Sequence, residues 1–121
     1  MRTFVALFAF VALLLSADEI FSGKWESKHN GNVGDLRIQL KPTPNVTFTL
    51  NDMEVKTKVV SVSHTDSDFA IAYDYDIEGH KLRSSLKGTV KEGVIEGTYA
   101  AAPADGGSPL DEGTFSVNLN K

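Results

Sequence analysis

The sequence predicts an all-β domain, an up-and-down barrel of about eight antiparallel strands. After residue 20, apolar and polar residues alternate in short runs, and no helical period appears. Gly, Asn, Asp and Pro separate these runs, and two-residue turn signals join several of them into hairpins. Closure removes the exposed edges of an open sheet, so a barrel is favoured, with a β-sandwich as the alternative. The expected strands are 21–28, 34–41, 46–51, 53–63, 68–77, 80–90, 94–100 and 112–119.

The first residues resemble a secretory leader in composition. Arg2 supplies a positive start, an unbroken apolar run covers residues 4–15, and small residues follow at Ser16 and Ala17. This run is shorter than the roughly 20 apolar residues that cross a bilayer. We therefore expect a signal peptide at residues 1–17, a secreted protein without membrane contact after cleavage, and a single β-barrel domain at 18–121.

The turns at 78–79 and 92–93 determine which residues face each other across two hairpins. On one face, charge opposes charge, as in Asp74 opposite Arg83, whereas hydroxyl-bearing and apolar residues meet on the other. The second face is expected to line the barrel interior. The residues predicted to point inward are Leu36, Ile38, Phe48, Ile71, Tyr73, Tyr75, Ser84, Leu86, Tyr99, Phe115 and Val117.

The strand expected at 53–63 has an interrupted pattern. The turn at Asn51-Asp52 places Phe48 opposite Val55, but Val60 and Val62 then fall on the outward face. We expect a β-bulge in this strand, because one extra residue exchanges the two faces.

A short repeat places glycine two residues before an inward side chain. It occurs as Gly88-Thr89-Val90, Gly97-Thr98-Tyr99 and Gly113-Thr114-Phe115. Inward glycines allow strands to coil tightly, so the repeat supports closure of the barrel. Between the last two copies, residues 100–113 are rich in small residues and are expected to form the one long loop.

Gly23-Lys24-Trp25, in the first expected strand, resembles the Gly-x-Trp signature of the calycins, the superfamily of lipocalins, fatty-acid-binding proteins and avidins. The stretch HTDSDFAIAYDY at 64–75 looks like the lipocalin Thr-Asp segment, and residues 22–38 are similar to the opening of avidins. The two helices of fatty-acid-binding proteins are replaced here by a turn, and the chain has one tryptophan where avidins use several. The resemblance implies a calycin-like barrel in which Gly23 and Trp25 form a structural plug at one end.

Composition argues against several classes of function. Without Arg2, eleven basic residues stand against sixteen acidic ones, a formal net charge of −5, which makes nucleic acid a poor partner. The absence of cysteine excludes thiol catalysis, and the aspartates and histidines lack the spacing of calcium or zinc sites. Ser84 lies outside any nucleophile-elbow motif. We therefore expect no enzyme activity, no metal and no cofactor.

The predicted inner wall is mostly apolar with a few hydroxyl groups, which is typical of a small-molecule pocket. We expect a carrier or scavenger of a small, largely apolar ligand. The alternative is a protein-binding or inhibitor module with a filled core, acting through loops 29–34 and 101–112. Asn45 begins an N-glycosylation sequon that a eukaryotic host could use. The candidate ligand-binding residues are Phe48, Tyr73, Tyr75, Ser84 and Tyr99.

Overall fold

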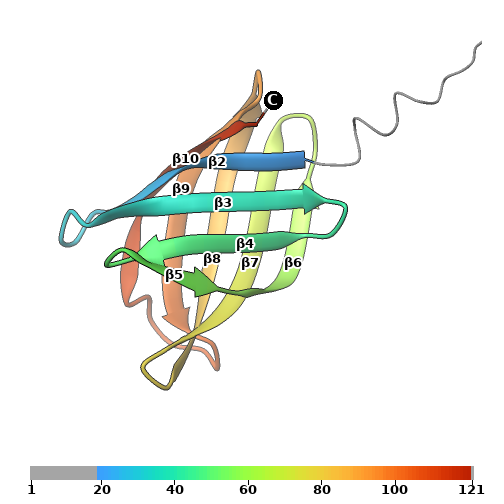
Figure 1. Cartoon of the computed structure of the whole chain (residues 1–121). Helices are drawn as coiled ribbons and strands as arrows, with labels where there is room; N and C mark the ends of the chain where they lie inside the picture. Colours follow the sequence, from blue (N-terminus) through green and yellow to red (C-terminus); the bar gives the residue numbers. More distant parts are fainter. Residues whose placement is uncertain (1–18, 121) are drawn as a thin grey trace, which may run out of the picture.

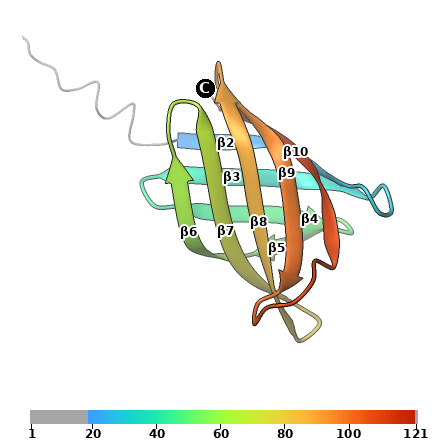
Figure 2. The same cartoon turned by 180° about the vertical axis from the view of Figure 1, so that it is seen from behind.

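A computed structural model describes residues 19–120 and confirms the all-β fold class. These residues form a nearly closed, barrel-shaped sheet of nine antiparallel strands (Figures 1 and 2). The predicted signal peptide at 1–17 lies outside the described residues. Between residues 19 and 120 there is no helix that could span a membrane. The strands are β2 (Glu19–Ser27), β3 (Val33–Lys41), β4 (Asn45–Leu50), β5 (Met53–Lys56), β6 (Lys58–His64), β7 (Asp68–Ile77), β8 (His80–Lys91), β9 (Val94–Pro103) and β10 (Asp111–Leu119).

The strand order explains how the sheet closes. It runs β5-β4-β3-β2-β10-β9-β8-β7-β6, so hydrogen bonds join the first and last described strands, β2 and β10. The two edge strands, β5 and β6, are consecutive in the chain, and only Thr57 separates them. In Figures 1 and 2, strands β2 to β5 cross strands β6 to β9 on the opposite side of the molecule. A single continuous sheet excludes the sandwich alternative.

The interrupted strand accounts for the difference between eight expected strands and nine observed ones. The chain divides at Thr57, whose Oγ1 donates a hydrogen bond of 2.6 Å to the carbonyl oxygen of Val46. The expected bulge is confirmed by a register shift between Val59 and Ser61. The first half of this segment therefore pairs with β4 and the second half with β7, as a bent strand at a barrel corner does.

The predicted hairpin registers of β7, β8 and β9 are confirmed, because the turns adopt the required backbone conformation. Glu78 and Gly79 have φ angles of 51° and 85°, the primed geometry that matches strand twist. Asp74 accordingly lies opposite Arg83, and Arg83 Nε donates to Asp74 Oδ1 at 2.6 Å. This hydrogen bond lowers the pKa of Asp74. The side chains of Arg83 and Asp74 are 41% and 34% exposed, so the charged face predicted from sequence is the outer one.

The two Gly-Thr-aromatic motifs of β9 and β10 pair with each other. Phe115 lies opposite Gly97, and Tyr99 lies opposite Gly113. A Cβ atom on Gly113 would lie 2.7 Å from Tyr99 Cε2 and 1.9 Å from the carbonyl oxygen of Glu26. The ring of Phe115 instead lies against Gly88 of β8, where a Cβ atom would be 3.2 Å from Cζ. Glycines of neighbouring strands thus make room for both rings, an arrangement that sequence alternation alone does not reveal.

One end of the barrel is filled by aliphatic and phenyl side chains. Because neighbouring strands are antiparallel, the early residues of β2, β4, β7 and β9 share this end with the late residues of β3 and β10. Six apolar side chains, each at most 4% exposed, close this end: Phe21, Ile38, Val46, Phe69, Ile95 and Val117.

Candidate functional site

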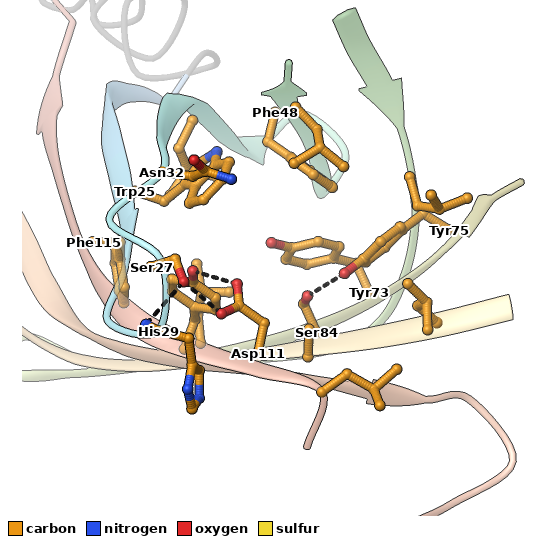
Figure 3. A pocket seen from close by; sticks show the side chains of 18 of the residues that line it. Trp25, Ser27, His29, Asn32, Phe48, Tyr73, Tyr75, Ser84, Asp111 and Phe115 are labelled. Carbon is orange, nitrogen blue, oxygen red and sulfur yellow. Dashed lines mark hydrogen bonds between the residues drawn. The ribbon is translucent and has the colours of Figure 1, made fainter. Parts of the chain in front are cut away.

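The opposite end of the barrel holds a cavity of about 280 Å³ (Figure 3). Residues of the β2–β3 turn and of the loop before β10 lie at its rim, and its wall comes from both crossing groups of strands. All five residues predicted to bind a ligand line this cavity, and their binding role stays a prediction. Six aromatic side chains contribute to the wall: Trp25, Phe48, Tyr73, Tyr75, Tyr99 and Phe115.

One side of the cavity is an aromatic cluster on β4 and β7. The rings of Phe48 and Tyr75 meet edge to face with centroids 5.0 Å apart, and Phe48 and Tyr73 are separated by 6.1 Å. Tyr75 and Ser84 share a hydrogen bond of 2.8 Å between their hydroxyl groups. Burial raises the pKa of Tyr75 and that of Tyr73, so both phenols are neutral at physiological pH.

The hydroxyl group of Tyr73 differs from that of Tyr75. Tyr73 is only 5% exposed, yet within residues 19–120 its hydroxyl makes no hydrogen bond of 3.5 Å or less. Figure 3 shows its ring extending into the cavity. Ser84, the nearby hydroxyl that lowers the pKa of Tyr73, makes its 2.8 Å hydrogen bond to Tyr75 instead. A buried hydroxyl whose neighbour is already engaged favours a ligand or water that satisfies it.

The other side of the cavity carries a carboxylate held by hydroxyl groups. Ser27 Oγ donates to Asp111 Oδ1 at 2.6 Å, and the Tyr99 hydroxyl donates to Asp111 Oδ2 at 2.9 Å. The backbone amide of His29 donates in turn to Ser27 Oγ at 3.2 Å. Burial, followed by the contact with Asp111, raises the pKa of Tyr99, so its hydroxyl stays a donor.

Trp25, predicted to be a barrel-end plug, lies in the cavity wall. Its indole Nε1 donates to the carbonyl oxygen of Thr49 at 3.0 Å, and its ring meets Tyr99 edge to face at 6.0 Å. The indole passes over Gly34, where a Cβ atom would lie 2.4 Å from Nε1. Gly23 lies at a close approach to β10, where a Cβ atom would be 1.9 Å from the carbonyl oxygen of Ser116.

Asp111 and Ser27 are the site residues that sequence reasoning missed. The long loop was expected at 100–113, but β9 continues to Pro103 and β10 begins at Asp111, so the connection is only residues 104–110. This boundary was wrong because small residues gave no strand pattern. A signal was nevertheless present, since Asp111 continues the inward alternation of Phe115 and Gly113 by two further residues.

The remaining candidate positions lie away from the cavity. Asn45, the glycosylation candidate, is exposed at the start of β4, where it pairs with Gln39. No group of three or more metal-ligating side chains occurs in the part of the chain that the structure describes.

Together, the fold and the cavity define a class: a small antiparallel β-barrel, filled at one end and hollow at the other, compatible with a calycin-like architecture. Comparisons of the chain with protein-family models, curated proteins and solved structures find no match.

Proposed function

We propose that this protein is a secreted, calycin-like barrel that carries or scavenges a small, largely apolar molecule. The observation that supports this proposal is the cavity of about 280 Å³, which all five candidate ligand-binding residues line. Barrels of about eight strands have interiors that either fill with side chains or hold one small ligand. Here aliphatic residues fill one half, and aromatic rings surround a space in the other.

The size of the cavity limits the ligand. Its volume lies just below the roughly 300–1,000 Å³ typical of pockets for drug-sized ligands. At about 30 Å³ for each water-sized group, it has room for roughly nine such groups. We infer a compact ligand of about ten non-hydrogen atoms rather than a long-chain lipid.

We infer binding rather than catalysis at this site. The Ser84 hydroxyl shares its hydrogen bond with the Tyr75 phenol, and the raised pKa of this phenol makes it a poor general base at neutral pH. The proposal requires no cofactor and no nucleic acid. Secretion is proposed from the apolar run within residues 1–17, and the calycin relationship from Gly23-Lys24-Trp25.

A protein-binding or inhibitor module that acts through loops 29–34 and 101–112 is the second candidate. Its supporting observation is Leu110, which is 65% exposed at the rim of the cavity. Exposed apolar side chains in loops are common contact points for protein partners.

A cavity-filling variant tests the proposed function. Ala101→Leu adds three carbon atoms to a buried residue of the wall, whereas Ala100→Leu adds them at the neighbouring, outward position. Titration with neutral 2-phenylethanol, followed by calorimetry and by fluorescence of the single tryptophan, Trp25, should give saturable binding to the wild type and to Ala100→Leu. Binding to folded Ala101→Leu should be at least about tenfold weaker, because the added side chain occupies the ligand volume. Equal affinity for all three proteins would place the binding elsewhere and contradict the proposal.

A further inference from the structure

We propose that the cavity selects an organic cation, a protonated amine on a compact apolar body, with the Asp111 carboxylate as its anchor. This inference rests on the proposed binding function and adds the chemical class of the ligand.

The cavity wall carries an unbalanced negative charge. Asp111 is the one carboxylate among the residues that line the cavity, and no lysine or arginine lines it. In the described part of the chain, Asp111 takes part in no ion pair, whereas its neighbour Glu112 pairs with Lys28 on the outer surface. The protein thus supplies negative charge to the interior without a cation to balance it, and a positively charged ligand would supply that balance.

Hydroxyl groups hold the Asp111 carboxylate in place. Each carboxylate oxygen accepts one hydroxyl donor, from Ser27 at 2.6 Å and from Tyr99 at 2.9 Å. Hydroxyl donors orient the carboxylate but leave its charge in place. A carboxylate has about four acceptor positions, so about two stay open for the N–H groups of an ammonium ion. Such charge-assisted hydrogen bonds are shorter and stronger than neutral ones.

An aromatic surface lies beside the carboxylate. Tyr99 donates to Asp111 and also meets the indole of Trp25 edge to face, so two electron-rich rings adjoin the anchor. A cation within about 6 Å of such a ring is attracted by its quadrupole.

The hydroxyl of Tyr73, which makes no hydrogen bond of 3.5 Å or less within residues 19–120 while its neighbour Ser84 bonds Tyr75, supplies an independent indication of a polar ligand group. Tyr73 is 5% exposed, and its ring extends into the same cavity from the opposite wall (Figure 3). Its oxygen can accept a hydrogen bond from a second donor of the ligand, or from a water molecule that the ligand retains. Phe48 and Leu86 would contact the apolar body between these two polar ends.

Three probes with nearly the same body separate charge from shape: 2-phenylethylamine, 2-phenylethanol and 3-phenylpropionate, which are cationic, neutral and anionic at pH 7. We expect the wild-type protein to bind the amine about tenfold more tightly than the alcohol, because one charge-assisted hydrogen bond contributes on this scale, and to bind the anion most weakly. The affinity for the amine should fall as the salt concentration rises, and the affinity for the alcohol should not.

Two variants of adjacent residues form a matched pair, because each removes one negative charge. Asp111→Asn removes it from the cavity, and Glu112→Gln removes it from the outer surface. We expect Asp111→Asn to weaken amine binding about tenfold and alcohol binding less than about twofold, with Glu112→Gln unchanged for both. Equal loss for amine and alcohol in Asp111→Asn would overturn the anchor role. If Asp111→Asn does not fold, the affinities of the wild-type protein for the three probes, and their salt dependence, test the cation selectivity instead.

The outcomes distinguish the two proposals. Binding of the alcohol without preference for the amine would overturn the cation selectivity and leave the proposed carrier function standing. Failure of all three probes to bind the folded wild type would overturn both.

Discussion

The two ends of the barrel follow the same alternating pattern, but only one end is filled. At the filled end, Ile38, Val46, Ile95 and Val117 are completely buried. Branched aliphatic side chains are compact, and such side chains pack closely in protein cores. At the cavity end, the side chains are mainly aromatic rings, and several of these rest on glycines of neighbouring strands. Large side chains therefore leave space where a glycine on the neighbouring strand makes room for the ring to lie along the wall.

The largest effect is expected at the filled end. Ile95→Ala removes three carbon atoms from a fully buried site, and we expect it to lower the free energy of unfolding by about 3 kcal/mol. Chemical denaturation measures this change. Val94→Ala, one residue earlier on the opposite face and only partly buried, is the control and should cost about 1 kcal/mol or less. Equal losses of unfolding free energy in the two variants would mean that the buried side chain of Ile95 does not stabilise the fold more than its partly buried neighbour.

A smaller effect is expected where a glycine carries a ring of the cavity wall. Gly113→Ala places a Cβ atom 1.9 Å from the carbonyl oxygen of Glu26 and 2.7 Å from Tyr99 Cε2, so β10 and the ring must both shift. We expect a loss of about 2 kcal/mol in unfolding free energy, together with a change in Trp25 fluorescence, because Tyr99 adjoins the indole. Thr114→Ala, which faces outward on the same strand, is the control. An unchanged emission spectrum would show that the ring does not depend on this glycine.

The smallest effect concerns alkaline pH, and its tyrosine part belongs to the cavity end, because all three tyrosines of the chain line the cavity. Burial raises the pKa of Tyr73, Tyr75 and Tyr99 in the folded state. Folding thus favours the protonated phenols, and this contribution to stability is complete below about pH 10 and is lost as the pH rises above it. We expect the melting temperature to fall from pH 9 to pH 10.5.

Absorbance of tyrosinate measures the same shift directly. At pH 10.5 the native protein should show little ionised tyrosine, whereas more than half should be ionised in denaturant, as expected for an unperturbed pKa of about 10. Superimposable titration curves for the native and denatured protein would mean that the phenols of the cavity are open to water.

The sequence contains enough information for the hairpins but not for the cavity. Turns such as Glu78-Gly79 determine register locally, so the opposition of Tyr73 and Ser84 could be predicted and is confirmed. The hollow could not be predicted, because alternation indicates which side chains face inward and not whether they fill the space. That depends on partners distant in sequence, as when the Trp25 indole rests on Gly34 and donates to Thr49.

Two further features depended on weak patterns. The division at Thr57 falls between two lysines, with no glycine or proline to mark it, and was anticipated only as a bulge. Asp111 was assigned to a loop, because the small residues before it gave no strand signal. Its inward position follows from the alternation with Gly113 and Phe115 once β10 is known to extend back to Asp111, and the pairing of Gly113 with Ser27 places it at the cavity.

The glycines beneath the rings of Tyr99 and Phe115 also constrain how such a barrel can diverge. A side chain at position 113 would meet both the Tyr99 ring and the backbone of β2, and one at position 88 would meet both the Phe115 ring and the backbone of β9. Among related chains, we therefore expect glycine to be kept at positions 88 and 113 wherever the rings are kept, so that the binding volume is inherited together with these glycines.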